Sequence, residues 1–193
     1  MSNLVLAMIG KMIGVPFVAA ILAGVQPGVG QVRKTEVVKP TTPDDDAKGL
    51  SPEVPESVAV SAKFERVVIL RFKHQADLLA GLERHVKEQK IRNAVILSGI
   101  GSVISAHYHV VSNRSFPSKN MFVENPEASA DITGMNGYVL NGKVHAHITF
   151  SDADRAFGGH LEPRTRVFTF AIVTLGVLPD HLDLTRFDDK TWR

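Results

Sequence analysis

The sequence predicts a single folded domain of the α/β (α+β) class, with one main helix after the first strand and a largely antiparallel mixed sheet. Helical periodicity occurs once, early in the folded part, and a series of strand-like patterns follows it. Asn141-Gly142 lies between two of these patterns and is a strong β-hairpin signal. The domain is expected to cover residues 63–180, which is enough chain to bury a core.

The elements follow one another in a clear order. Residues 66–72 are apolar on both faces and predict a strand in the centre of the sheet. Residues 75–89 predict a helix, because leucine and valine recur there at helical spacing. Further strands are expected at 94–97, 103–111, 129–140, 143–151 and 166–177, with a tight glycine turn at 98–102 and a polar loop at 113–127.

Three flanking segments are expected outside this domain. Residues 1–30 hold an apolar run and a single charged residue, Lys11, which is typical of a signal peptide or an uncleaved membrane anchor. A cleaved signal would export the protein to the periplasm or cell envelope, and an uncleaved segment would attach it to the membrane. If translation instead starts further downstream, the segment is not informative and the protein would be cytoplasmic. Residues 31–62 read as a flexible Pro- and Asp-rich linker, and residues 181–193 as a polar C-terminal tail.

The composition excludes several classes of function. The chain has no cysteine, so disulfides, thiolate nucleophiles and cysteine-ligated zinc are excluded. Its formal net charge of +2 provides no strong basic field, which argues against nucleic-acid binding.

The chemistry of the chain is expected at three histidines. His145 and His147 alternate with apolar residues in a strand pattern, so both should project from one face of the sheet. A following strand-to-strand loop should return His160, which Gly158-Gly159 precede. Three neutral imidazoles with an open fourth position are typical of zinc or a similar transition metal. The alternative is that these histidines only occupy the polar face of a strand or a loop.

A second pair, His107 and His109, has the same spacing. We interpret it as the polar face of a strand, since no third ligand is evident nearby in the sequence. Gly99 and Gly101 are expected to permit the tight turn rather than to bind a ligand.

The combined pattern resembles the plant-and-prokaryote-conserved (PPC) domain family over about residues 67–178. The resemblance rests on Leu97-Ser98-Gly99-Ile100-Gly101-Ser102-Val103, Asn141-Gly142-Lys143-Val144-His145-Ala146-His147 and Gly158-Gly159-His160-Leu161. It implies a compact α/β domain that assembles as a homotrimer, and a fold similar to that of acetolactate decarboxylase. By analogy with that enzyme, His145, His147 and His160 fall at metal positions, and zinc is the expected metal.

The resemblance also implies DNA binding through an AT-hook, as in plant members of the family. However, the hook sequence Arg-Gly-Arg-Pro and the hexapeptide Gly-Arg-Phe-Glu-Ile-Leu of those members do not occur in this chain.

Three functions therefore follow as hypotheses. The first is an exported metal-binding protein, with a possible small-molecule ligand at the metal and no assigned reaction. The second is a metal-dependent lyase or hydrolase acting on a small carbonyl or ester substrate. The third is DNA binding. For the second, candidate proton-transfer or anchoring groups are Glu124, Asp131, Arg155 and Arg164. Candidate acceptors for the histidine N–H groups are Asp152, Asp154 and Glu162.

Overall fold

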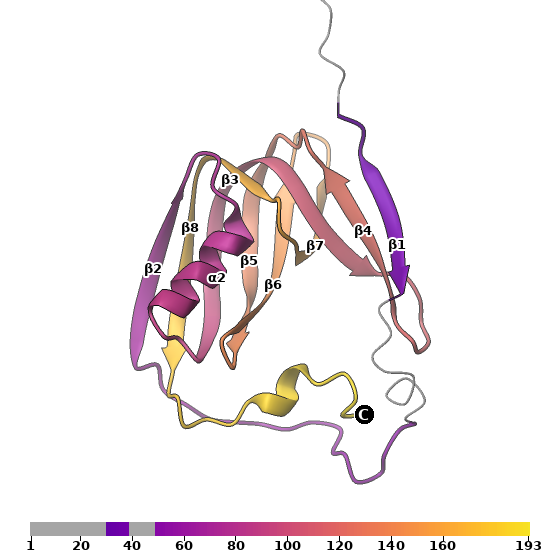
Figure 1. The fold of residues 1–193 in the computed structure, drawn as a ribbon, viewed down its shortest axis with the longest axis vertical. Helices are drawn as coiled ribbons and strands as arrows, with labels where there is room; N and C mark the ends of the chain where they lie inside the picture. The colour runs from indigo at the N-terminus through magenta and orange to yellow at the C-terminus, as the bar shows by residue number, and fades with distance from the viewer. Residues whose placement is uncertain (1–29, 39–48) are drawn as a thin grey trace, which may run out of the picture.

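The structure, a computed structural model, describes residues 30–38 and 49–193. It confirms an α+β domain with a mainly antiparallel sheet (Figure 1). The strands are β1 (Arg33–Val38), β2 (Arg66–Lys73), β3 (Asn93–Val111), β4 (Lys119–Asn125), β5 (Ala130–Leu140), β6 (Lys143–Ser151), β7 (Ala156–Leu161) and β8 (Arg166–Leu178). The helices are α2 (Leu78–Glu88) and the short 3-10 helix η1 (Thr185–Asp188).

The single main helix forms where the periodicity predicts it. Asp77 caps its N-terminus by accepting a hydrogen bond from the Ala80 backbone N–H at 3.0 Å. Leu78, Leu82 and Val86 are buried and pack against the sheet. Helix α2 therefore covers one face of the sheet, as Figure 1 shows.

The strands pair in the order β1-β4-β3-β5-β6-β7, and β8 joins β2 to the first part of β3. Because β3 is long, its first half lies beside β5 and its end lies beside β7. The strands β3, β5, β6 and β7 thus close into a ring. Its interior contains Tyr108, Phe150 and Phe157, whose ring centroids lie 5.5 to 6.3 Å apart.

The glycine turn expected at 98–102 is not a turn. Residues 93–111 form one continuous strand, and its register against β8 shifts between Ile96 and Ser98 and again between Gly101 and Val103. Gly101 has φ +149°, which bends the strand without ending it. The glycines that we assigned to a turn instead let β3 change neighbours along its length.

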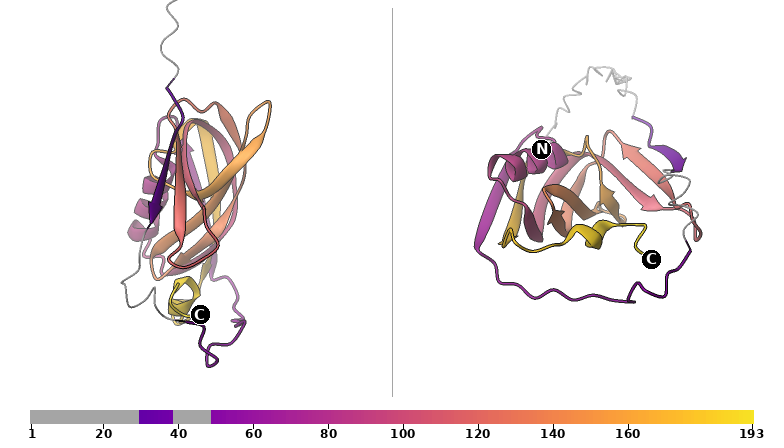
Figure 2. Two further views of the ribbon diagram at one scale, coloured as in Figure 1. Left: turned by 90° about the vertical axis from the view of Figure 1, so that its right-hand side faces the viewer. Right: turned by 60° about the horizontal axis from the view of Figure 1, so that its bottom comes forward.

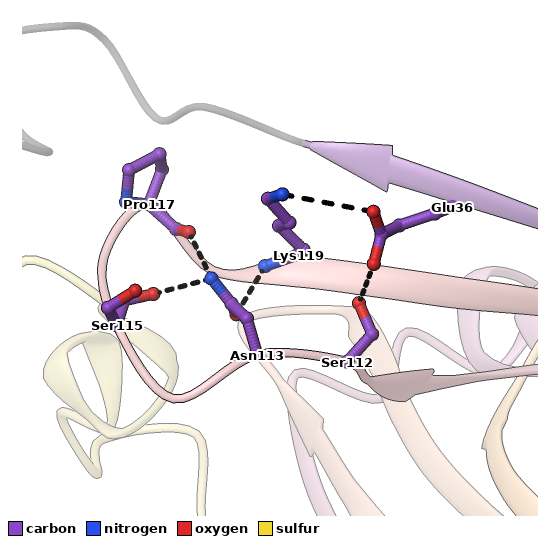
Figure 3. Close-up of polar contacts among 6 residues, drawn as sticks. All are labelled: Glu36, Ser112, Asn113, Ser115, Pro117 and Lys119. Carbon is purple, nitrogen blue, oxygen red and sulfur yellow. Dashed lines mark hydrogen bonds and ion pairs between the residues drawn. The ribbon is translucent and has the colours of Figure 1, made fainter.

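Two segments that we expected to be irregular contain strands. β4 lies within the predicted polar loop 113–127, and β1 lies within the predicted linker 31–62. Side chains join these strands: Glu36 accepts a hydrogen bond from Ser112 at 2.8 Å and lies 3.8 Å from Lys119 Nζ (Figure 3). Asn113 shapes the turn between β3 and β4 through hydrogen bonds to Ser115, Pro117 and Lys119.

The sheet has a second face that α2 does not cover, which we call the open face. Directly opposed residues in antiparallel strands share a face, so the register defines its members. They include Val67 and Ile69 of β2, Tyr138 of β5, His145 and His147 of β6, and His160 of β7.

Strand β2 does not occupy the central position that we predicted. In the described part of the chain it pairs with β8 alone. Its apolar residues do not reflect burial on both faces. Leu70 and Phe72 are buried, whereas Val67 and Ile69 on the open face are 55% and 69% exposed.

The C-terminal tail packs back onto the domain beneath the sheet, as Figure 1 and Figure 2 show. The buried Asn93 side chain donates to the Leu182 carbonyl at 3.1 Å and accepts from the Asn141 backbone N–H at 3.2 Å. Leu184 is buried as well.

The predicted signal peptide or anchor falls on residues 1–30, which, apart from Gly30, lie outside the described residues. Among residues 30–38 and 49–193, none of the helices has the length and apolar character needed to cross a bilayer.

Candidate metal centre

The structure brings the three predicted histidines together on the open face. His145 and His147 alternate with buried residues of β6, and His160 lies directly opposite His147 on β7. The His160 ring stands nearly perpendicular to the other two, with centroids 4.8 Å from His145 and 5.5 Å from His147. His160 therefore lies on a strand rather than in the loop that we expected.

The donor atoms of these rings suit a metal ion. One nitrogen from each histidine lies within 4.8 Å of the other two. Zinc–imidazole bonds are about 2.0–2.1 Å long, so small side-chain rotations would bring all three nitrogens to bonding distance. The residues present therefore fit a transition metal with a three-nitrogen donor set.

Glycine at position 159 allows β7 to enter this narrow space. A Cβ atom on Gly159 would lie 2.4 Å from the carbonyl oxygen of His109. Because that atom belongs to the backbone of β3, it has little freedom to move away. Gly159 thus sets how closely β7 approaches β3, and so where His160 lies.

His109 joins the cluster, which corrects our interpretation of the His107 and His109 pair. The His109 and His160 ring centroids are 4.5 Å apart, because these residues face each other across β3 and β7. His109 Nδ1 donates to Glu162 Oε1 at 2.6 Å. His109, His160 and Glu162 form a second group able to hold a metal, and His160 belongs to both groups.

His107 has a structural role instead. The residue is 8% exposed, and its Nδ1 donates to the Pro163 carbonyl at 2.7 Å. Thr165 is also buried and bonds to the His107 backbone N–H at 3.1 Å. These bonds hold the turn between β7 and β8.

His145 is oriented by a residue that the sequence did not indicate. Its Nδ1 donates to Asp188 Oδ1 at 2.8 Å, which leaves Nε2 with its lone pair for a metal. Of the acceptors that we proposed, Glu162 accepts the hydrogen bond of His109. Asp152 instead accepts from the backbone N–H groups of Asp154 and Arg155, both at 2.9 Å, within its own loop.

Three of the four candidate catalytic residues take part in ion pairs. Arg164 lies 3.5 Å from Glu124, and Arg155 lies 3.7 Å from Asp152. Asp131 is exposed and pairs in register with Ser151 at the end of β6. The polar groups that the structure places beside the three histidines include Asp188, the His109–Glu162 pair and Asn136, which lies directly opposite His147.

The surroundings favour neutral imidazoles. The pKa of His160 is lowered to about 4, first by burial of the ring and then by charge on His109 and His145. Burial, followed by charge on His145 and His109, also lowers the pKa of His147. Both rings therefore keep free lone pairs at neutral pH, as metal ligation requires.

Acid should destabilise the metal-free protein for the same reason. A histidine in an unfolded chain has a pKa of about 6.5, so the unfolded state binds more protons than the folded state between about pH 6.5 and pH 4. We expect the free energy of unfolding, measured by urea titration after chelation, to fall as the pH drops through this range. His160→Gln should lose less stability over the same range; an equal loss would contradict this account.

A mainly antiparallel sheet with one covering helix and a cluster of strand-borne histidines defines the class: a compact α+β domain with a candidate metal centre. Residues 59–179 match the family model of the Plants and Prokaryotes Conserved (PCC) domain, also abbreviated PPC. The chain belongs to this family.

Solved structures show the same fold. A metal-containing protein from Archaeoglobus fulgidus has a TM-score of 0.54 at 22% identity, covering 63% of this chain and 86% of that one. A plant- and prokaryote-conserved protein from Pyrococcus horikoshii has a TM-score of 0.52 at 22% identity, covering 64% and 85%. At this identity the likeness concerns the fold alone.

Curated relatives are much longer than the matching region. The bifunctional protein GlmU of two Synechococcus strains is 27% and 30% identical over 117 and 111 residues. These matches cover 60% and 57% of this chain but 17% of each relative.

Proposed function

We propose that this protein binds one divalent transition metal ion, with zinc favoured, through His145, His147 and His160. The observation that carries the proposal is the convergence of three imidazoles from β6 and β7, one of them held in a fixed tautomer by Asp188. The A. fulgidus structure of the same fold, which is that of a metal-containing protein, supports it.

Metal content tests this proposal directly. Full-length protein purified without chelators is expected to carry about one metal ion per chain by mass spectrometry. His145→Ala and His147→Ala should each lose it, because a two-histidine remnant holds zinc weakly. His85→Ala is the matched control, since His85 lies on α2 beside Phe72. Full metal retention in both site variants would refute the assignment.

Removing Asp188 should weaken the metal centre without abolishing it. Asp188→Ala leaves the His145 ring free to rotate and change tautomer, and such losses typically reduce metal affinity by about 10–100-fold. The zinc dissociation constant, measured by competition with a chromophoric chelator, checks this. Asp180→Ala changes an exposed carboxylate of the same tail and should leave the affinity unchanged. Equal affinities in all three proteins would contradict a positioning role.

A metal-dependent lyase or hydrolase is the second candidate function. A metal bound by three histidines supplies a Lewis acid and can lower the pKa of a bound water. The observation that favours it is the His109–Glu162 pair, which lies one strand from His160 and has the form of a proton-transfer pair. The likeness to acetolactate decarboxylase stays a prediction, and so does export.

Assembly as a homotrimer also stays a prediction. Four apolar side chains on β2, β3 and β8 support this prediction. They are exposed on the surface of one part of the sheet, and exposed apolar patches often mark contacts between proteins. The four residues are Val67, Ile69, Ile100 and Phe170.

A further inference from the structure

An apolar pocket of about 400 Å³ lies between the sheet and the C-terminal tail. Ala62 and Phe64 line one side of it, and Tyr138 lines the sheet side. The tail closes it with Leu182, Leu184 and Phe187. The volume is within the range of small-molecule sites, which run from about 300 to 1,000 Å³ and are mostly apolar.

This pocket adjoins the candidate metal centre through two of its wall residues. Tyr138 lies directly opposite His145 across β5 and β6, on the same face of the sheet. Opposed side chains in such pairs have Cβ atoms about 5 Å apart. Phe187 immediately precedes Asp188, the acceptor of the His145 hydrogen bond.

The tail that builds this wall lies beyond the part of the chain that matches the family, which ends at residue 179. It is nevertheless firmly docked: Asn93, which is fully buried, donates to the Leu182 carbonyl, and the Leu184 side chain is 6% exposed. The tail thus adds to the conserved domain both an apolar wall and the carboxylate of Asp188.

We propose that the pocket receives the apolar body of a small ligand whose oxygen-bearing head group binds the metal. This inference rests on the proposed metal centre and names its ligand class: alkyl or aryl compounds with a carboxylate, carbonyl or similar head. The apolar lining excludes a charged body, because burying an unpaired charge there is costly. Tyr138 supplies the polar group between body and head.

Two hydroxamates that share a head group but differ in chain length test the proposal. Acetohydroxamate and octanohydroxamate are titrated calorimetrically into the zinc-loaded full-length protein. The longer chain buries more apolar surface, so we expect it to bind at least about tenfold tighter. Ala62→Trp fills the pocket and Ala62→Asp places a charge in it, and both should remove this advantage. Ala153→Trp, in the exposed β6–β7 loop, is the control.

The outcomes separate the two proposals. Normal metal content with equal affinities for both hydroxamates would overturn the pocket inference and leave the metal centre standing. A chain-length advantage that survives in both Ala62 variants would also overturn it. If no metal binds, the proposed function fails, and binding of anilinonaphthalene sulfonate to the metal-free chain tests the apolar site alone. Fluorescence enhancement lost in Ala62→Trp would then support the site, and no enhancement would overturn it.

Discussion

His160→Ala is expected to abolish measurable zinc binding. His160 is the one residue shared by both groups of potential ligands, so no alternative set of three remains among the described residues after its loss. Competition with a chromophoric chelator measures the affinity. His160→Gln, which keeps a similar volume, shows whether a folding defect contributes.

His109→Ala is the informative comparison for this result. It removes the second group and leaves His145, His147 and His160 intact. If the metal lies where we propose, this variant keeps most of its metal. Retention in His160→Ala together with loss in His109→Ala would place the metal elsewhere.

Gly159→Ala is expected to destabilise the fold by about 2–3 kcal/mol, a large effect for the addition of one methyl group. The added Cβ would meet the His109 carbonyl oxygen at 2.4 Å, so β7 must move away from β3. Urea unfolding measures the loss of stability. The same displacement moves His160, so the variant should also bind zinc more weakly.

Gly134→Ala provides a matched control on β5. Apart from the adjoining residues, no atom lies within 4 Å of a Cβ atom there, so this variant should change the free energy of unfolding by less than about 0.5 kcal/mol. Similar stabilities for the two variants would show that β7 is not held as closely as the backbone geometry requires.

The sequence predicted the elements whose patterns are local. The α2 helix has an unbroken apolar stripe, and Asn141-Gly142 is a turn in which both residues have positive φ, as the hairpin signal requires. The alternation in β6 correctly placed His145 and His147 on one face. Each of these signals depends only on residues a few positions apart.

The remaining features depend on contacts between distant parts of the chain. β1 and β4 are short and polar, and they become strands because each finds a partner edge. His109 joins the cluster only because β3 bends far enough to meet β7. Asp188 reaches His145 only because the tail docks onto the sheet. Spacing along the sequence contains no signal for such encounters.

The ring formed by β3, β5, β6 and β7 is closed by a short pairing between β3 and β7. Within the described residues, β7 meets β3 through two residue pairs, Tyr108 with Leu161 and His109 with His160. Local opening should begin at such a short strand pairing, because few hydrogen bonds resist it. The His109–Glu162 hydrogen bond and the neighbouring His109 and His160 rings do span β3 and β7, so they should oppose this opening. Through His109 and His160, the histidine cluster would then influence the dynamics of the domain as well as its chemistry.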